Sequence, residues 1–252
     1  MQTAPETTLR VANSEQVTLS LNVDAPLLRV SLEPRFGEAR GITLTDGAFV
    51  FPYYDDPDMV KVTWYGENGE KFKTYVEVVS RHYFDLDDLR LYGDNMDDFD
   101  ELPEGVLYMA RQAATEVVEQ AAHRSWVHRI GRTKDFGHLF WLADNDVYQL
   151  LTEGYQLVSD CQVKPDGTAH VPFPVWVEYL YGMETIPAQV SRATLQLAAY
   201  MLRPSNRPLG ATGESTDAGY IHFTTAGRDG ATDIPEVNAA IIQFGRGERV
   251  LW

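Results

Sequence analysis

Apolar and polar residues alternate along QVTLSLNV, residues 16–23. Successive side chains of a β-strand point to opposite faces of its sheet, so this alternation predicts a strand with one buried face. The predicted inward residues are Val17, Leu19, Leu21 and Val23. A helix would need apolar residues three and four positions apart instead. The chain is therefore expected to begin as a β structure.

Similar segments precede and follow this strand between Thr7 and Tyr83. They read TLRVA, LLRVSLE, AFVFP, VKVTWYG and KTYVEVVSRHYF, and Gly, Pro, Asn and Asp clusters separate them. Between the last two lies Asn68-Gly69, a pair that tolerates positive φ at both central positions of a tight hairpin turn. Six or seven short strands within about eighty residues predict an N-terminal β-sandwich, placed at residues 1–84.

Residues 85–104 are strongly acidic. Nine carboxylates against the single base Arg90 give this segment a net charge of −8, half of the −16 carried by the whole chain. An EF-hand loop needs Gly at its sixth and Glu at its twelfth position, and no register of the segment supplies both. We expect a solvated linker over residues 85–102, whose last carboxylates favour the N-terminus of the following helix.

Helical periodicity begins after this acidic segment. Residues 103–122 carry one apolar series at spacings of three and four, with a second series beside it: Val106, Ala110, Ala113, Val117 and Ala121, then Leu107, Ala114 and Val118. Residues 187–202 predict a second amphipathic helix, and a short third helix begins near Pro235. A hairpin is predicted between Gln149 and Pro174, where it serves either as a docking loop or as a connector.

These elements predict an α+β multidomain protein in which the sandwich is followed by a small α-helical bundle with a β-hairpin. The expected boundaries are residues 1–84 for the sandwich, 85–102 for the acidic linker, 103–245 for the helical domain and 246–252 for a C-terminal tail. With 252 residues and 44% hydrophobic content, the chain can bury a substantial core.

The excess of acidic over basic residues limits the kinds of partner that the protein can bind. A net charge of −16 argues against an electrostatic grip on nucleic acid or on an anionic membrane, because both need a positive surface. The single cysteine, Cys161, excludes an internal disulfide framework and favours a reducing compartment. No apolar run approaches the length of a membrane span, and the N-terminus lacks the features of a signal peptide, so we expect the chain to fold in the cytosol.

Catalytic and metal-binding patterns are absent from the sequence. His123, His128 and His138 are five and ten residues apart, which does not align them on one helical face. Residues 226–230 form a glycine-containing loop that is too short and wrongly flanked for a phosphate-binding motif, which needs a preceding strand, a Lys-Ser or Lys-Thr end and an immediate helix. No Gly-x-Ser-x-Gly elbow occurs. We therefore expect no catalytic residues, no cofactor and no metal.

The tail combines basic and apolar residues: Arg246, Gly247, Glu248, Arg249, Val250, Leu251 and Trp252. Three consecutive apolar residues suit insertion into a partner, because solvated chain ends are normally polar. The alternative is that Trp252 folds back onto the core of its own subunit. The sequence leaves both open.

Residues 103–246 resemble the head-to-tail adaptor proteins of tailed bacteriophages, also called connector or head completion proteins. The resemblance is carried by the helix end AATEVVEQAAHRSW and by the later order of a helix led by proline, a GY strand, a TTAGRDG loop and a DIPEVN helix. It implies a helical bundle that assembles into a ring, expected to be dodecameric, beneath the portal of the capsid. Such a ring extends the DNA channel, and the protein belongs to the virion after assembly in the host cytoplasm.

The resemblance also implies roles for particular residues. The tail from Arg246 to Trp252 becomes the arm that docks into the portal protein. The loop of Lys164, Pro165, Asp166 and Gly167 faces the downstream connector, stopper or tail terminator protein, and genomic DNA passes without specific binding. Many such adaptors consist of the helical part alone, so the role of the N-terminal sandwich stays open.

Two other functions compete with this one. In the first, the protein is a multimeric binding module whose sandwich recognises a carbohydrate or a protein, which exposed Trp64, Tyr53 and Tyr54 would favour. In the second, the protein is an enzyme that uses the acidic run and the nearby histidines.

Overall fold

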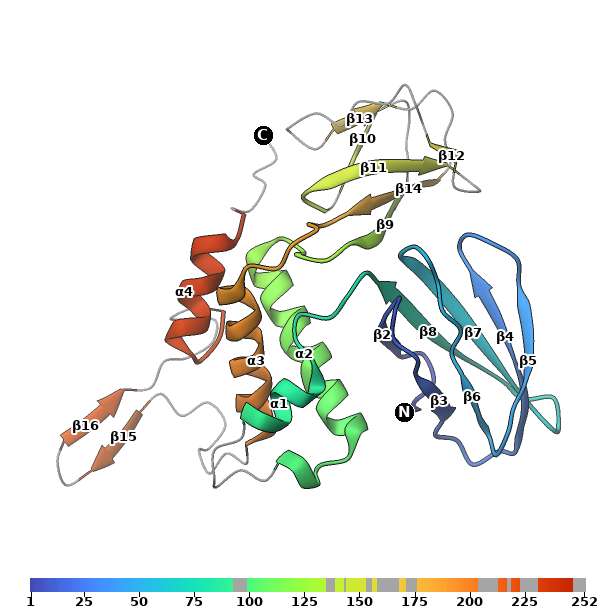
Figure 1. The fold of residues 1–252 in the computed structure, drawn as a ribbon, viewed down its shortest axis with the longest axis horizontal. Coiled ribbons are helices and arrows are strands. Elements are labelled where there is room, and N and C mark those ends of the chain that lie inside the picture. Colours follow the sequence, from blue (N-terminus) through green and yellow to red (C-terminus); the bar gives the residue numbers. More distant parts are fainter. Residues whose placement is uncertain are drawn as a thin grey trace. The chain divides into compact units, whose positions relative to one another are not determined.

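The computed structural model (Figure 1) describes residues 1–92, 99–134, 139–142, 144–152, 156–157, 168–170, 176–203, 213–216, 219–222 and 231–246. The fold is α+β, as predicted. Two compact units share the chain. The sheet unit comprises Met1–His82 and Ser125–Thr185, and the helical unit comprises Tyr83–Arg124 and Ile186–Trp252.

A five-stranded sheet is the larger of the two sheets within residues 1–82. Its strand order is β2-β8-β7-β4-β5, in which β2 pairs parallel with β8 and the other pairs are antiparallel. The strands are β2 (Thr8–Ala12), β4 (Leu27–Pro34), β5 (Arg40–Thr43), β7 (Asp58–Gly66) and β8 (Lys71–Val79). Its central strands carry fully buried β-branched residues on the inner face, including Val30, Val60 and Val62.

A three-stranded sheet lies in the same region, with the order β1-β3-β6. Its strands are β1 (Gln2–Thr3), β3 (Thr18–Leu21) and β6 (Ala48–Val50). Val17, Leu19 and Leu21 are buried while Thr18 is exposed, which confirms the predicted alternation. Phe49 of β6 meets Trp64 of β7 edge to face, with ring centroids 5.4 Å apart. The packing of both sheets as a sandwich stays a prediction.

The turn between β7 and β8 is a hairpin, but of another type than predicted. The Gly66 amide donates to the Glu70 carbonyl at 2.9 Å, and the Gly69 amide donates to the Gly66 carbonyl at 3.2 Å. Gly69 has φ +89°, whereas Asn68 is not among the residues with positive φ. This is the pattern of a three-residue loop that ends in a left-handed glycine, so a two-residue turn with two positive φ values was the wrong expectation.

Residues 125–185 contribute a second β region to the sheet unit. Its four-stranded sheet has the order β12-β11-β14-β9, and β10 pairs separately with β13. The strands are β9 (Arg129–Lys134), β10 (Leu139–Trp141), β11 (Val147–Thr152), β12 (Gln156–Leu157), β13 (Thr168–His170) and β14 (Trp176–Tyr181). The turn at residues 164–167 of the predicted hairpin lies outside the described residues, as does its first strand.

The two β regions share a hydrophobic cluster. Phe36 from the N-terminal strands packs with Ile130, Leu151 and Leu180, and the half-buried Met59 adjoins them. This grouping differs from the predicted boundaries, which placed residues 125–185 inside a helical domain at 103–245. The resemblance over residues 103–246 suggested that assignment, whereas these strands pack with residues about a hundred positions away.

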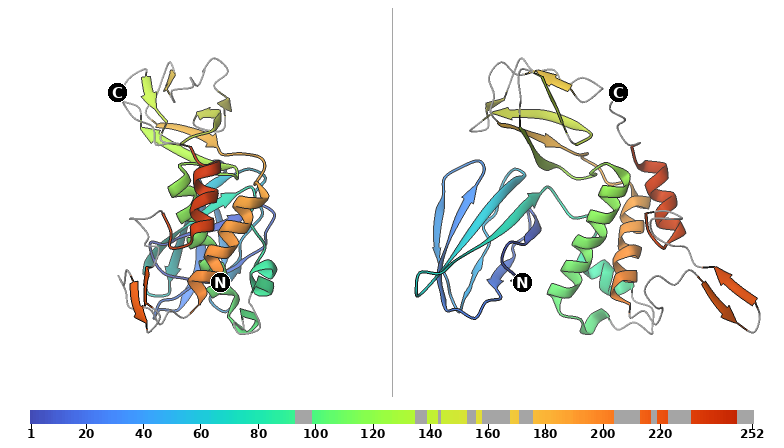
Figure 2. Two further views of the ribbon diagram at one scale, coloured as in Figure 1. Left: turned by 90° about the vertical axis from the view of Figure 1, so that its left-hand side faces the viewer. Right: turned by 180° about the vertical axis from the view of Figure 1, so that it is seen from behind.

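The helical unit contains α1 (Leu86–Tyr92), the 3-10 turn η1 (Phe99–Glu101), α2 (Glu104–Ala122), α3 (Ala188–Leu202), α4 (Pro235–Phe244) and the strand pair β15 (Gly213–Thr216) and β16 (Gly219–His222). The three predicted helices are confirmed, and prolines stand at or just before their first residues. Helix α3 contacts both α2 and α4, and α1 contacts α2 and α3 (Figure 2).

The predicted acidic linker is not purely a solvated segment. Helix α1 lies within it, and Leu89 of α1 and Phe99 of η1 are buried. Their burial outweighs the low helix-forming tendency of the aspartates around them, because each apolar side chain removed from water stabilises by about 1.5–3 kcal/mol.

The buried face of α2 contains the second of the two predicted series together with Ala110 of the first. Leu107, Ala114 and Val118 are buried, whereas Val106 and Ala113 are exposed. Neighbouring residues of a helix are about 100° apart, so two adjacent apolar series look alike in the sequence. Packing in the folded molecule decides which positions of the two series are buried, and the expectation that Val106 and Ala113 face the core was wrong.

Candidate functional site

Arg246 is the only residue of the predicted docking tail that the structure describes. Gly247, Glu248, Arg249, Val250, Leu251 and Trp252 lie outside the described residues, as do Lys164, Pro165, Asp166 and Gly167 of the predicted tail-facing loop. The structure therefore informs the base of the tail, where the last helix ends.

The ends of α2 and α4 meet at a point that we call the helix-end junction, residues 122–124 and 244–246. The Arg246 amide donates to the Ala122 carbonyl at 2.8 Å. The Arg124 guanidinium donates to the Phe244 carbonyl at 3.1 Å. A Cβ atom at Gly245 would lie 2.5 Å from the Ile241 carbonyl oxygen and 3.1 Å from the Ala122 Cα. A side chain at this position would collide with the last turn of α4 itself and would meet the end of α2 tightly, so glycine suits the junction.

The helix-end junction is also favourable electrostatically. Helix α2 ends at His123, whose left-handed φ of 50° lets its amide bond back to the Gln120 carbonyl. The carbonyl ends of both helices carry partial negative charge, and Arg124 places a cation there. The sequence prediction did not include Arg124, although a basic residue just after a helix end is a recognisable signal.

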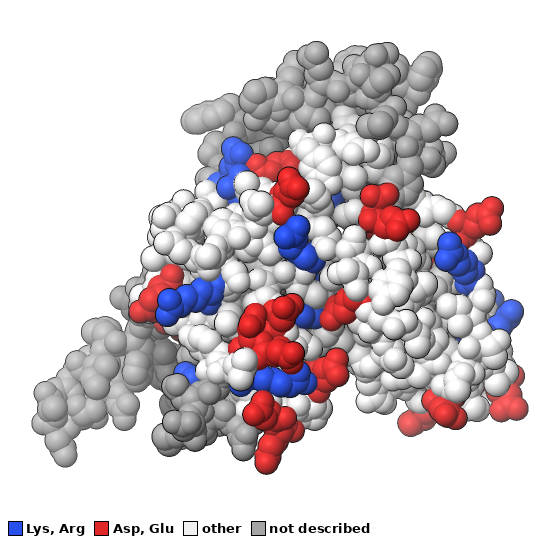
Figure 3. All heavy atoms as spheres, in the orientation of Figure 1, with Lys and Arg blue, Asp and Glu red and all other residues white. Residues whose placement is uncertain are grey.

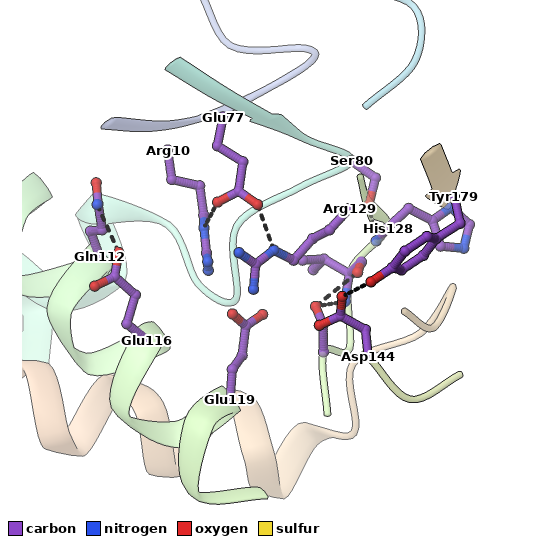
Figure 4. A network of polar contacts seen from close by, with 12 residues as sticks. Arg10, Glu77, Ser80, Gln112, Glu116, Glu119, His128, Arg129, Asp144 and Tyr179 are labelled. Carbon is purple, nitrogen blue, oxygen red and sulfur yellow. Dashed lines mark hydrogen bonds and ion pairs between the residues drawn. The ribbon is translucent and has the colours of Figure 1, made fainter. Parts of the chain in front are cut away.

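A buried ion network joins the two β regions of the sheet unit (Figure 4). Glu77 of β8 accepts from Arg10 of β2 (Nε to Oε2, 3.1 Å) and from Arg129 of β9 (Nε to Oε1, 2.6 Å). Burial by itself disfavours a charged carboxylate, but the guanidinium groups of Arg10 and Arg129 outweigh it and hold the pKa of Glu77 below its usual value. Glu77 therefore forms ion pairs with two arginines. A carboxylate paired in this way is typical of a structural role.

Glu178 of β14 repeats the arrangement. Its carboxylate forms ion pairs with Arg35 (Nη1 to Oε2, 2.9 Å) and with Arg132 of β9 (Nε to Oε1, 3.0 Å). The sequence prediction did not include these groups. Their signal is a lone glutamate within an apolar strand, YVEVV for Glu77 and WVEYL for Glu178. A carboxylate in such a run needs a cation, because an unpaired buried charge is costly.

The pKa of Glu77 predicts a pH dependence of stability. The folded pKa is lower than the unfolded value near 4.5, so this contribution is complete above that value and is lost as the pH falls through the folded pKa. Between about pH 6 and about pH 3, the unfolding free energy should fall more steeply for the natural protein than for Glu77→Gln in urea titrations. Parallel slopes for the two proteins would contradict this assignment.

The aromatic residues named for the binding-module alternative are not all available. Trp64 is buried, and its indole Nε1 donates to Thr74 Oγ1 at 2.9 Å. Tyr54 is half-buried and stacks on Phe51 at 5.4 Å, and burial, with a smaller effect of Asp58, raises its pKa to about 12. Tyr53 alone of the three is well exposed, at 58%. The expected aromatic surface is therefore reduced to one residue.

Two of the three histidines considered in the sequence, His123 and His128, lie among the described residues and have separate surroundings. His123 ends α2, and the His128 ring lies 4.7 Å from the ring of Tyr148. Burial lowers the pKa of His128, and the Arg81 charge adds to this while Glu184 opposes it. His138 lies outside the described residues. Over the described part of the chain, no group of three or more His, Cys, Asp or Glu side chains is arranged to hold a metal ion.

The helical unit contains a hollow of about 430 Å³, lined by Tyr92, Gln196, Tyr200, Arg203 and Ile234. These side chains combine two phenols and an aliphatic group with one amide and one cation. The described lining therefore offers both apolar and hydrogen-bonding contacts.

Comparison with known proteins gives no match, either to a protein-family model or to a curated protein sequence. Among the described residues, no helix is long and apolar enough to cross a membrane.

Proposed function

We propose that this chain is a non-enzymatic structural protein of a tailed-phage virion, a head-to-tail adaptor. Its subunits form a ring, expected to be dodecameric, that joins the portal to the tail and extends the DNA channel. In this proposal the N-terminal sandwich at residues 1–84 widens the contacts of the ring with its neighbours or with the capsid, and the protein lies at the head-tail junction of the virion.

The observation that carries the proposal is the helix-end junction. The Arg246 amide bond to Ala122, the Arg124 bond to Phe244 and the absence of a side chain at Gly245 together give the tail a rigid base. A rigid base reduces the entropy that a docking arm loses on binding. Arg246 and Arg249 would then pair with portal carboxylates, while Trp252 enters a pocket, since Trp and Arg are frequent hot-spot residues.

The charge distribution supports a channel that DNA does not adhere to. On the face drawn in Figure 3, the Lys and Arg side chains of the described residues are scattered among Asp and Glu and form no continuous basic surface. Together with the net charge of −16, this favours passage of the duplex over binding. The downstream connector, stopper or tail terminator protein would contact the loop from Lys164 to Gly167.

Deletion of residues 247–252 tests the proposal. The shortened chain should keep its thermal unfolding curve, because it retains Arg246 and the bonds of the helix-end junction. It should nevertheless fail to join portal-bearing capsids, and electron microscopy should show no ring stacked coaxially on the portal. Gln189→Ala, at an exposed position of α3 outside the tail, is the control, which should bind as the natural protein does. Undiminished stacking by the shortened chain would contradict the assignment of the tail.

A multimeric module that binds carbohydrate or protein is the second candidate. The observation that favours it is the exposure of Tyr53 at 58% and Tyr148 at 47%, because exposed aromatic rings can stack on sugar faces. A glycan array should use the whole chain, since residues 1–84 alone would lack Arg129, a partner of Glu77. Binding that Tyr53→Ala removes would favour this candidate over the adaptor.

A further inference from the structure

The five-stranded sheet has an outer face, opposite the face that carries Val30, Val60 and Val62. Side chains alternate along a strand, so the neighbours of these buried residues in β4, β7 and β8 point to the outer face. The three strands lie side by side (Figure 1), and their register arranges the outer residues in rows across the sheet. We call six of these residues the cationic face: Arg29, Tyr65 and Lys71 in one row, Lys73 in the next row, and Glu33 with Lys61 in the third.

The cationic face is positive although the protein as a whole is acidic. The chain has only five lysines, and Lys61, Lys71 and Lys73 are three of them. Together with Arg29 and the single carboxylate of Glu33, they give the cationic face a net charge of +3. The whole chain carries −16, so the residues outside this face carry −19. A concentration of cations on one face of an acidic protein is typical of a surface that attracts an anionic ligand.

Three of the four cations are available to a ligand. Lys61 pairs with Glu33 at 2.9 Å, whereas Arg29, Lys71 and Lys73 are exposed. Among the described residues, no carboxylate forms an ion pair with any of these three. An anionic ligand that binds them therefore does not have to break an existing ion pair.

Tyr65 holds two of the three available cations in position. Arg29 lies on one neighbouring strand, with its Cζ 4.6 Å from the centre of the Tyr65 ring. Lys71 lies on the other neighbouring strand, with its Nζ 5.6 Å from the same centre. The attraction between a cation and an aromatic ring restrains these side chains before a ligand arrives, which reduces the entropy that is lost on binding.

Stacking on an aromatic ring contributes little at the cationic face. Nucleobases and sugar faces are recognised largely by stacking on open aromatic rings. The Tyr65 ring is half-buried, and the cations of Arg29 and Lys71 lie over it. The donors of these cations remain, and arginine in particular can bind both oxygens of a carboxylate at once. The face therefore favours carboxylates over nucleobases and sugars.

The extent of the cationic face favours a short ligand. Side chains two residues apart on a strand are about 6.8 Å apart, so three rows span about 14 Å. Glu6 is an acidic residue at the border of the face, because its amide donates to the Lys73 carbonyl at 2.7 Å. Charges act over about 10 Å at 0.1 M salt, so a polyanion longer than the face meets the negative charge around it. A long nucleic acid is therefore disfavoured, whereas a short acidic segment fits.

We propose that the cationic face binds an acidic segment of another protein in an extended conformation. Alternate side chains of an extended peptide are about 6.8 Å apart, which is also the spacing of Lys71 and Lys73 on β8. Carboxylates at alternate positions of the segment therefore pair with Lys71 and Lys73, and a further carboxylate pairs with Arg29 across the row. The cationic face lies within the sheet unit, so this inference does not depend on the proposed adaptor function.

Fluorescence anisotropy of a labelled peptide with the full chain tests the proposal. The probe is a short peptide of alternating Glu and Ser, and the same peptide with Gln in place of Glu is its control. The Glu peptide should bind saturably, and less tightly as salt is added, whereas the Gln peptide should not bind. Equal binding of the two peptides, or no binding of either, would overturn the proposal.

Two variants that remove the same charge identify the surface. Lys71→Gln with Lys73→Gln should weaken binding of the Glu peptide by about tenfold, because two ion pairs with the peptide are lost. Arg40→Gln with Arg192→Gln removes two cations at exposed positions outside the cationic face and should change the affinity by less than about twofold. All four positions are exposed, so both variants should keep the thermal unfolding curve. Equal affinities of the two variants would refute the role of Lys71 and Lys73.

Two further measurements distinguish other occupants of the cationic face. A labelled oligothymidylate that binds more tightly than the Glu peptide, and that the Lys71 and Lys73 substitutions release, would assign the face to single-stranded nucleic acid. Sedimentation of the chain without peptide reports on a second copy, and self-association that the same substitutions abolish would assign the face to that copy. Either result would overturn an acidic partner protein as the occupant.

Discussion

Replacement of Glu77 by Gln is expected to lower the free energy of unfolding by about 3–5 kcal/mol at neutral pH, the range found when one partner of a buried ion pair is removed. The side chains of Arg10 and Glu77 are only 4% and 6% exposed. A glutamine amide accepts a hydrogen bond but gives no charge to two nearby guanidinium groups. Urea unfolding followed by tryptophan fluorescence measures the difference.

Glu33→Gln is the matched control for this prediction. The Lys61–Glu33 pair has a similar distance of 2.9 Å, but its side chains are 36% and 41% exposed. Solvent screens such a pair, so the loss should be about 0–1 kcal/mol. If both variants lose the same amount, the Glu77 network does not hold the two β regions together as described.

Gly182→Ala should be nearly as damaging. Gly182 follows β14 with φ +104°, and a Cβ atom there would lie 2.0 Å from the Val127 carbonyl oxygen. The backbone conformation costs an alanine about 1–3 kcal/mol, and the collision adds about 1–3 kcal/mol because backbone on both sides must shift. Differential scanning calorimetry should show a lower unfolding temperature than for the natural protein.

Two other glycines separate these contributions. Gly69 has φ +89°, but a Cβ atom added there would meet nothing within 4 Å, so Gly69→Ala carries the conformational cost alone. Gly41 has neither a positive φ nor a neighbour within 4 Å, so Gly41→Ala should be nearly neutral. The loss of stability on substitution by alanine is expected to be largest at Gly182, smaller at Gly69 and smallest at Gly41. Equal damage at Gly69 and Gly182 would show that the contact with Val127 is unimportant.

The local elements were predictable because their signals lie within a few residues of sequence. The alternation around Leu19 predicted β3, and the spacing of Leu107, Ala114 and Val118 contributed to the prediction of α2. Asn68-Gly69 located a turn correctly but not its type, since the same pair fits loops of two and of three residues. Signals of this kind depend on backbone geometry alone.

Longer-range features were not predictable from one sequence. The choice between the series of Val106 and that of Leu107 depends on which helices pack against α2. The grouping of Ile130 with Phe36 depends on contacts between distant segments. Glu77 and Glu178 were visible as charges in apolar strands, yet nothing in their spacing identified the arginines that neutralise them. The helix-end junction likewise required knowledge that Ala122 and Gly245 meet.

The path of the chain between its two units has a mechanical consequence. The backbone passes from one unit to the other at residues 82–83, 124–125 and 185–186. Any tension between the units is therefore divided among three covalent links, whereas two domains in simple succession share one. Neither unit can be excised by a single cut, so truncation at residue 84 leaves both parts incomplete, and permuted or internally spliced chains are needed to isolate either.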